Sequence, residues 1–176
     1  MTAGRKFSAI KIKHLRYADP LSEAPTKEGL AVAFGAASKV DNVHQDTFQY
    51  EEAEPTVTRY KNQLTGQIYR TDVEEGEVFI SFVIGEYDMA TKAAMQGGTE
   101  GDSGASWKRG KAEPHYKCIY AVTEDDVCIV FPKGNIVGAG KSQDKAIGLS
   151  LKAVPEEVSA EVAPEYWFDA NGLSLT

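Results

Sequence analysis

Apolar side chains at every second position restrict the fold of this chain more than any other feature. The segment AIGLSLKAV, residues 146–154, places isoleucine, leucine, leucine and alanine on one face, with glycine, serine and lysine between them. A period of two is typical of a strand with one buried face. Similar β-prone or alternating runs lie at 7–13, 30–34, 47–51, 56–60, 67–71, 78–84, 116–123 and 127–131.

Two pairs of these runs predict hairpins. Residues 56–60 and 67–71 are joined by the turn-rich segment 61–66, and residues 116–123 and 127–131 flank an acidic turn. The run Val78–Ile84 has no polar side chain except Ser81, which predicts a central strand covered on both faces.

One helix is predicted at Met89–Gln96. Asp88 is a good N-cap because its carboxylate can accept hydrogen bonds from the first-turn amides, and Gly97 suits the left-handed position that ends a helix. Met89, Ala90, Ala93 and Ala94 would form a narrow apolar side that packs on a sheet.

Strands at this spacing with one helix predict a mainly β fold: a β-sandwich or half-closed barrel of two packed sheets, flanked by a short α-helix at about residues 88–96. The 176 residues suit one domain, predicted at 1–154 and including a long polar loop at 99–114. Residues 155–176 are predicted as an irregular C-terminal extension. Its aromatic triplet, residues 166–168, needs cover from the chain's own core or from a neighbouring subunit.

The net charge of −7, from 26 acidic and 19 basic residues, argues against tight binding of nucleic acid, which usually needs a basic excess. The chain either does not touch nucleic acid or lies near it without adhering. The first residues lack an apolar signal region, and no apolar run approaches the roughly 20 residues of a membrane span. We therefore expect synthesis in the cytoplasm and no membrane partner.

The strongest enzyme-like signal is NIVGAGKS, residues 135–142, which is one residue from a phosphate-binding loop. Asn135 replaces the first glycine, and an alternating strand follows where a helix is required. A glycine-rich connection between strands is the favoured interpretation. His44 with Asp41 and Asp46 lacks a second ligand at metal-site spacing, so no metal is predicted.

Cys118 and Cys128 are predicted to be reduced and buried, because a two-residue turn would not place them opposite each other. The paired acids at turns (Glu51-Glu52, Glu74-Glu75, Asp125-Asp126, Glu156-Glu157) are interpreted as solvated charges. No catalytic residue and no cofactor are predicted, and the chain is interpreted as not being an enzyme.

The order of elements resembles the major tail tube proteins of long-tailed bacteriophages, a family that shares its fold with the type VI secretion tube protein. The likeness covers roughly residues 28–155. It lies in the hairpin with LTGQI (64–68), the strand 78–84, the Asp-capped helix ending in Gly97-Gly98, the hairpin 119–132 and the strand KAIGLSLKA (145–153).

This resemblance implies a structural virion protein of a phage or prophage. Its subunits would form stacked hexameric rings around a channel through which DNA passes without specific binding. The partners would be other copies of the chain and other tail proteins, and the location would be the virion tail, after the host cytoplasm. The acidic balance is consistent with a conduit that must repel phosphate.

The interface predicted with this role consists of the helix, the glycines after it and the polar loop. The loop 99–114 would become ordered when rings stack, with Trp107 as its anchor. A mobile surface loop is the alternative. The residues assigned to this interface are Met89, Ala93, Gly97, Gly98, Trp107, Lys108, Arg109 and Lys111.

Two other functions stay open. A monomeric β-barrel or sandwich that binds a small ligand or glycan would have a pocket lined by aromatics such as Tyr116, Tyr120 and Phe131. An enzyme without a readable motif would depend on a pair of carboxylates.

Overall fold

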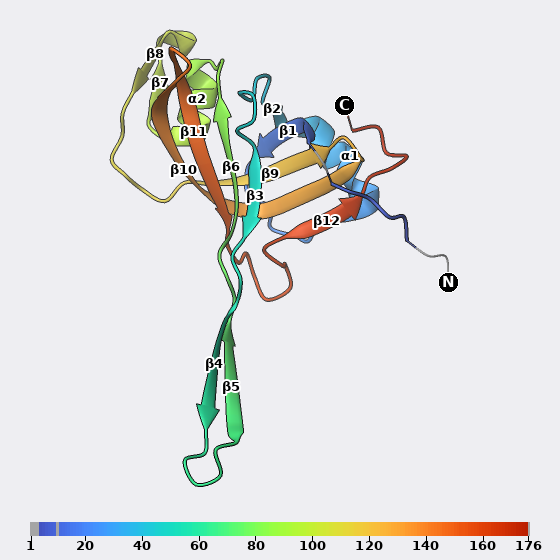
Figure 1. Ribbon diagram of the computed structural model, residues 1–176. Helices are drawn as coiled ribbons and strands as arrows, with labels where there is room; N and C mark the ends of the chain where they lie inside the picture. Colours follow the sequence, from blue (N-terminus) through green and yellow to red (C-terminus); the bar gives the residue numbers. More distant parts are fainter. Residues whose placement is uncertain (1–3, 10, 176) are drawn as a thin grey trace.

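The computed structural model describes residues 4–9 and 11–175 (Figure 1). The predicted Phe7–Lys13 strand includes Ile10, which lies outside the described residues. In the described part, the first strand begins only at Ile12. The elements are β1 (Ile12–Ala18), α1 (Lys27–Ala36), β2 (Ser38–Lys39), β3 (Gln49–Glu52), β4 (Thr56–Lys61), β5 (Ile68–Glu74), β6 (Val78–Ile84), α2 (Met89–Gln96), β7 (Thr99–Gly101), η1 (Asp102–Gly104), β8 (Ser106–Lys108), β9 (Tyr116–Thr123), β10 (Val127–Gln143), β11 (Ala146–Pro155) and β12 (Tyr166–Asp169).

One large antiparallel sheet forms the body of the molecule, with the strand order β2-β1-β9-β10-β11-β6-β3. The long strand β10 joins its two halves. Along one edge β10 pairs first with β12 and then with β11, and along the other edge it pairs with β9. The β9–β10 register shifts between Phe131 and Gly134, at Pro132, which has no backbone N–H to donate to a ladder.

The two halves of this sheet face each other across the main core. Ile119, Ile129 and Phe131 project into it from one half, and Ile80, Phe82 and Leu151 project from the other. The outermost strands, β2 and β3, do not pair with each other, so the barrel is half closed. The predicted mainly β class, with two packed layers of sheet and a short flanking helix, is confirmed.

A second core lies on the opposite face of the β1–β9–β10–β12 half. Alternate residues of the same strands, among them Tyr120, Val122 and Val130, pack there against Leu30 and Phe34 of α1. Both faces of β9 are therefore buried, which explains why its sequence is almost continuously apolar.

Helix α1 corrects the predicted strand at 30–34. Leu30 and Phe34 are separated by one helical turn and are both buried on the same side. The side chain of Thr26 accepts a hydrogen bond from the amide of Gly29 and so caps the helix. The run LAVAF fits a period of two as well as a helical period, and the cap decides between them.

Helix α2 confirms the predicted bounds and both predicted ends. The Asp88 carboxylate accepts a hydrogen bond from the Thr91 amide at 2.7 Å, and Gly97 has a φ of 76°. The buried face was predicted wrongly, because Met95 is fully buried whereas Met89 is exposed. A Cβ on Gly138 of β10 would lie 2.8 Å from the Met95 carbonyl oxygen, so the glycine permits this close approach of helix and strand.

The C-terminal segment is also more ordered than predicted. Strand β12 pairs with the start of β10, and Ala170 and Leu175 are buried in the second core. Tyr166 and Phe168 pack against that core, while Trp167 projects from the other face, 42% exposed, with its ring edge-to-face with Tyr50. The chain's own core therefore covers two of the three aromatics.

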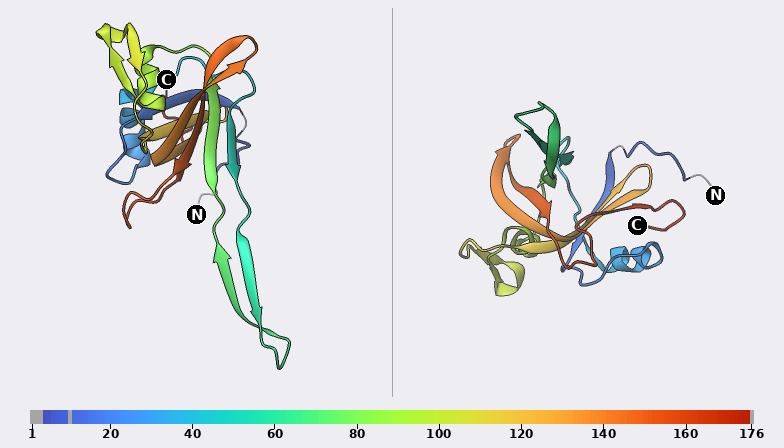
Figure 2. Two further views of the ribbon diagram at one scale, coloured as in Figure 1. Left: turned by 90° about the vertical axis from the view of Figure 1, so that its left-hand side faces the viewer. Right: turned by 90° about the horizontal axis from the view of Figure 1, so that it is seen from below.

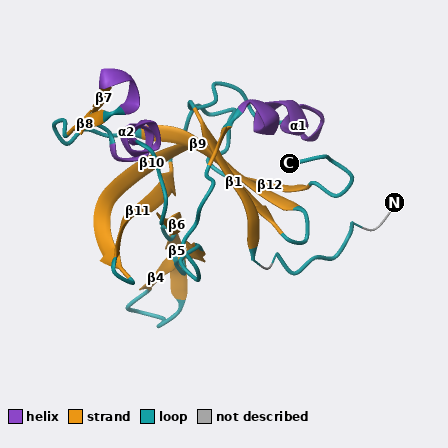
Figure 3. Cartoon of the chain, turned by 90° about the horizontal axis from the view of Figure 1, so that it is seen from above, coloured by secondary structure: helices purple, strands orange, loops and turns teal. Residues whose placement is uncertain are grey.

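Two small hairpins stand outside the large sheet. The β4–β5 hairpin confirms the predicted pair of strands and projects far from the body (Figures 1 and 2). The β7–β8 hairpin corrects the first part of the predicted loop 99–114, which is structured up to Lys108. Helix α2 and this second hairpin lie beside β10 and β11, whereas α1 lies over the other half of the sheet (Figure 3).

Candidate self-assembly interface

The predicted interface residues come together in one lobe, residues 88–111, built from α2 and the β7–β8 hairpin. The Trp107 indole N–H donates to the Gly97 carbonyl oxygen at 3.0 Å. A Cβ on Gly98 would lie 2.5 Å from the Lys108 carbonyl oxygen, so the glycine lets the helix end meet the hairpin. Met89, on the first turn of α2, does not share this contact.

Trp107 supports the lobe from within, and its predicted role as an anchor toward a second copy stays a prediction. Its ring lies between two cations, with Lys92 Nζ at 4.6 Å and Arg109 Cζ at 5.4 Å from the ring centroid. Cation–π contacts of this kind stabilise by about 0.5–1 kcal/mol each at exposed positions. The lobe is therefore already ordered in the single chain.

A groove of about 790 Å³ runs between the lobe, the connection 109–115 and β10. It is lined by small residues, by the exposed side chain of Val137 and by a few charged groups. Six of the eight predicted interface residues line this groove: Ala93, Gly97, Gly98, Trp107, Arg109 and Lys111.

Half of the exposed large apolar side chains lie elsewhere, on the β4–β5 hairpin. We call residues 53–76 the arm. Twelve large apolar side chains of the described residues are exposed, and six of them lie on the arm: Val57, Tyr60, Leu64, Ile68, Tyr69 and Val73. The sequence predicted the hairpin but not its separation from the core, because pairing of two strands does not determine what covers their faces.

The arm has one face on which apolar side chains gather. Val57 and Val73 are directly opposite each other across the two strands, so both project from the same face. Tyr69 and Thr71 alternate in phase with Val73 and share that face. Tyr69 is 70% exposed and Val73 is 61% exposed, so the described residues leave most of both side chains uncovered.

The base of the arm is strongly acidic. Glutamates occupy six positions where the arm leaves the body, and we call them the neck glutamates: Glu51, Glu52, Glu54, Glu74, Glu75 and Glu77. Glu77 is paired with Lys152; the other five make no ion pair within the part of the chain that the structure describes. Gly76 permits the two neck segments to approach, because a Cβ there would lie 1.9 Å from the Ala53 carbonyl oxygen.

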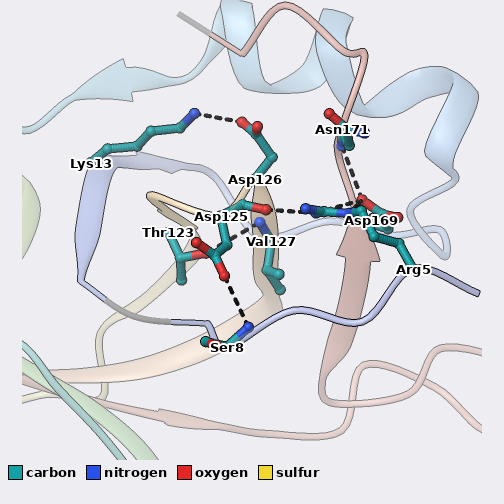
Figure 4. A network of polar contacts seen from close by, with 9 residues as sticks. All are labelled: Arg5, Ser8, Lys13, Thr123, Asp125, Asp126, Val127, Asp169 and Asn171. Carbon is teal, nitrogen blue, oxygen red and sulfur yellow. Dashed lines mark hydrogen bonds and ion pairs between the residues drawn. The ribbon is translucent and has the colours of Figure 1, made fainter.

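The N-terminal segment is held across the β9–β10 turn by a network of ion pairs and hydrogen bonds (Figure 4). The Arg5 guanidinium contacts the Asp169 carboxylate at 2.8 Å, and the Ser8 amide donates to Asp125 at 2.9 Å. The hydrogen bond from Arg5 holds the pKa of Asp169 below its usual value, and the amide of Asn171 acts in the same direction. Lys13 is paired with Asp126 beside them.

The two segments considered as possible phosphate or metal sites have other roles in the structure. Residues 135–142 lie within β10 and pair with β11, so the glycine-rich segment is a strand and not a connection. His44 Nε2 lies 2.8 Å from Asp144 of the β10–β11 turn. Among the described residues, no group of three or more His, Cys, Asp or Glu side chains is placed to hold a metal ion.

Both cysteines are free and fully buried on the second core, as predicted. The turn between them is one residue longer than predicted, so that Cys128 is opposite Val122. Burial raises the pKa of each thiol to about 12, because the thiolate would lose its hydration.

The predicted aromatic pocket does not form. Tyr120 and Phe131 are fully buried on opposite faces of the sheet. A cavity of about 650 Å³ lies instead at the open side of the half-closed barrel, between β1, the segment 40–48 and Tyr50. Phe48 of that segment and Trp167 of β12 add aromatic rings to its lining.

Comparison with protein-family models and with curated proteins gives no match to this chain. Neither helix in the described residues has the length and apolar character needed to cross a membrane.

Proposed function

We propose that this chain is a structural subunit that assembles with copies of itself, and specifically a major tail tube subunit of a phage or prophage. Its stacked hexameric rings would surround a channel for DNA, in the virion tail, and no chemical transformation would be involved. The resemblance in element order supports the ring and the channel. The exposed arm is the structural observation that carries self-assembly.

The arm needs a partner for thermodynamic reasons. A two-stranded hairpin alone is marginally stable in water, and three or more strands or a packed face are needed for independent stability. The arm has neither, since β4 and β5 pair only with each other. No residue from 51 to 77 is buried. A second copy that covers the apolar face of the arm would supply the missing layer.

The size of the exposed surface favours an extended assembly over an isolated pair. Burial of the three large apolar side chains on this face, Val57, Tyr69 and Val73, contributes on the order of 5 kcal/mol. Association costs an estimated 4–15 kcal/mol in lost freedom of motion. One arm contact therefore gives weak binding, while several simultaneous contacts between rings would give stable stacking with a critical concentration.

Replacement of the arm by a short turn tests this function. Ala53 and Glu77 are already adjacent, since the Ala53 amide donates to the Glu77 carbonyl oxygen at 2.9 Å. An Asn-Gly dipeptide in place of residues 54–76 would therefore close β3 and β6 into a short hairpin. We expect the unchanged chain to form rings or tubes at high concentration, seen by sedimentation and negative-stain electron microscopy.

The shortened chain should remain a folded monomer. Equal assembly by the shortened chain, or a monomeric unchanged chain at every concentration, would overturn the proposal.

The cavity beside Tyr50 supports a second candidate, a monomeric module that binds a small ligand. Its aromatic lining and open mouth suit an amphipathic molecule. Under this alternative, the chain would stay monomeric, and Trp167 fluorescence would change on ligand addition. Removal of the arm would leave that change intact.

A further inference from the structure

The base of the arm and the end of the lobe each carry a cluster of like charges, and the two clusters have opposite signs. The arm extends from one end, and the lobe with the tip of the β10–β11 hairpin forms the other (Figures 1 and 2). The neck glutamates lie at the base of the arm, and five of them lack an ion pair in the described part of the chain. Like charges this close repel each other, so the neck is stabilised by any cationic surface that approaches it.

The lobe carries the matching cations. Lys108, Arg109 and Lys111 follow one another at the end of β8, in the sequence KRGK. No salt bridge holds any of the three among the residues described. Arg109 is fixed on the face of Trp107, whereas Lys108 and Lys111 are exposed.

The groove beside these cations also suits the apolar face of the arm. Its walls contain Ala93, with a single methyl group, and Gly97 and Gly98, which have no side chain, so a strand can approach closely; Val137 is 67% exposed at its edge. Gln96 lines the same groove, and its Oε1 is buried without a hydrogen-bond partner within the described residues. A strand edge in the groove would supply a backbone N–H donor to that oxygen when the Gln96 side chain turns toward it.

We infer that the arm of one copy docks in the groove of the next copy, with the neck glutamates facing the cations of the KRGK segment. This inference rests on the proposed function, since it names the surface that receives the arm. The arm and the groove lie at opposite ends of the folded molecule, so the contact is head-to-tail. Such a contact leaves a free arm and a free groove on every dimer, and it continues as an open stack where the rotation from copy to copy does not close a ring.

Charge reversal on each side, alone and together, tests the pairing. The neck variant is Glu54→Lys with Glu75→Lys, and the lobe variant is Lys108→Glu with Lys111→Glu, which leaves Arg109 on Trp107. A control variant, Glu23→Lys with Glu28→Lys, matches the charge change of the neck variant at exposed positions just before and within α1, which lies over the other half of the sheet (Figure 3). Sedimentation measures the concentration at which half of each protein is assembled.

We expect the neck and lobe variants each to raise that concentration roughly tenfold, and the combined variant to restore it to within about threefold of the unchanged chain. The control should stay within about threefold. Restoration is the decisive readout, because a variant that merely misfolds is not rescued by changing the other surface.

The remaining outcomes separate this inference from the function on which it rests. If the unchanged chain assembles and loss of the arm prevents assembly, but the combined variant is not restored, the arm docks on another surface. The inference then fails while the proposed function stands. The inference alone also fails if the neck variant behaves like the control. If the unchanged chain never assembles, both fail together.

Discussion

The body and the arm of this chain differ in how their apolar side chains are covered. In the body, alternate residues of β9 and of the first part of β10 reach two cores, so these segments are covered on both faces. In the arm, β4 and β5 show comparable β-prone sequence, yet all their large apolar side chains are exposed. The difference teaches that the chain's own core determines the body, whereas the described residues leave the arm uncovered at the surface where we propose that a second copy binds.

Thiol reactivity should show the largest contrast between the two regions. Cys118 and Cys128 react only through unfolding, because they are buried and their thiol pKa is raised to about 12. A cysteine introduced by Thr71→Cys lies on the exposed apolar face of the arm. At pH 8 in dilute solution we expect the arm thiol to react with a disulfide reagent at least about a thousandfold faster. Comparable reaction rates for the arm thiol and the two core thiols would contradict this difference in burial.

Truncation of the core should give the largest change in stability. Phe131 is fully buried between the two halves of the sheet, so Phe131→Ala leaves a cavity as well as losing apolar burial. We expect a loss of about 3–5 kcal/mol in the free energy of unfolding, measured with denaturant. A loss below about 1 kcal/mol would show that the halves are not packed as described.

The matched truncation in the arm should affect assembly instead. Tyr69→Ala removes an aromatic side chain that the single chain leaves exposed, so the free energy of unfolding should change by less than about 0.5 kcal/mol. The concentration for half assembly should rise roughly tenfold, since aromatic side chains are common hot spots of interfaces. An unchanged assembly would mean that this face of the arm is not a contact.

The helix cap at Asp88 should have a smaller effect. Asp88→Ala leaves the first-turn amides of α2 without their acceptor and should cost about 1 kcal/mol. The hydrogen bond from the Thr91 amide lowers the pKa of Asp88, so its contribution is present above the unfolded pKa and is lost as the pH falls through the lowered value. The unchanged chain and Asp88→Ala should therefore converge in stability at acid pH.

The N-terminal network should give the smallest and most local effect. Because Arg5 lowers the pKa of Asp169, the ion pair persists at neutral pH and is lost as the pH falls through that lowered value. The Ser8 amide, which donates to Asp125, should then exchange faster with solvent. Arg5→Ala should give fast exchange already at neutral pH, and slow exchange in that variant would show that Arg5 does not hold the segment.

Local signals explain what the sequence could predict. The ends of α2, the two hairpins and the β11 strand depend on caps, turns and alternation within a few residues, and all are present. The helix α1 was missed because Leu30 and Phe34 satisfy both a period of two and a helical turn. A stronger weight on Thr26 as an N-cap would have indicated the helix.

The features that the sequence could not predict depend on contacts between segments that are distant along the chain. Nothing in the Tyr166–Phe168 triplet indicates pairing with Val130 and its neighbours, and nothing in β4 or β5 indicates that they leave the body. The predicted interface residues of the lobe do meet, because α2 and the β7–β8 hairpin are adjacent in sequence. Their contact with a second copy stays a prediction.

Amide hydrogen exchange at two protein concentrations tests the central claim most directly, because it reports on body and arm in one experiment. The amides of β9 and β10 should be protected equally in dilute and concentrated protein. The amides of β4 and β5 should exchange quickly when dilute and become protected as the concentration rises. Arm amides whose protection does not depend on concentration would contradict a role for the arm in joining copies of this chain.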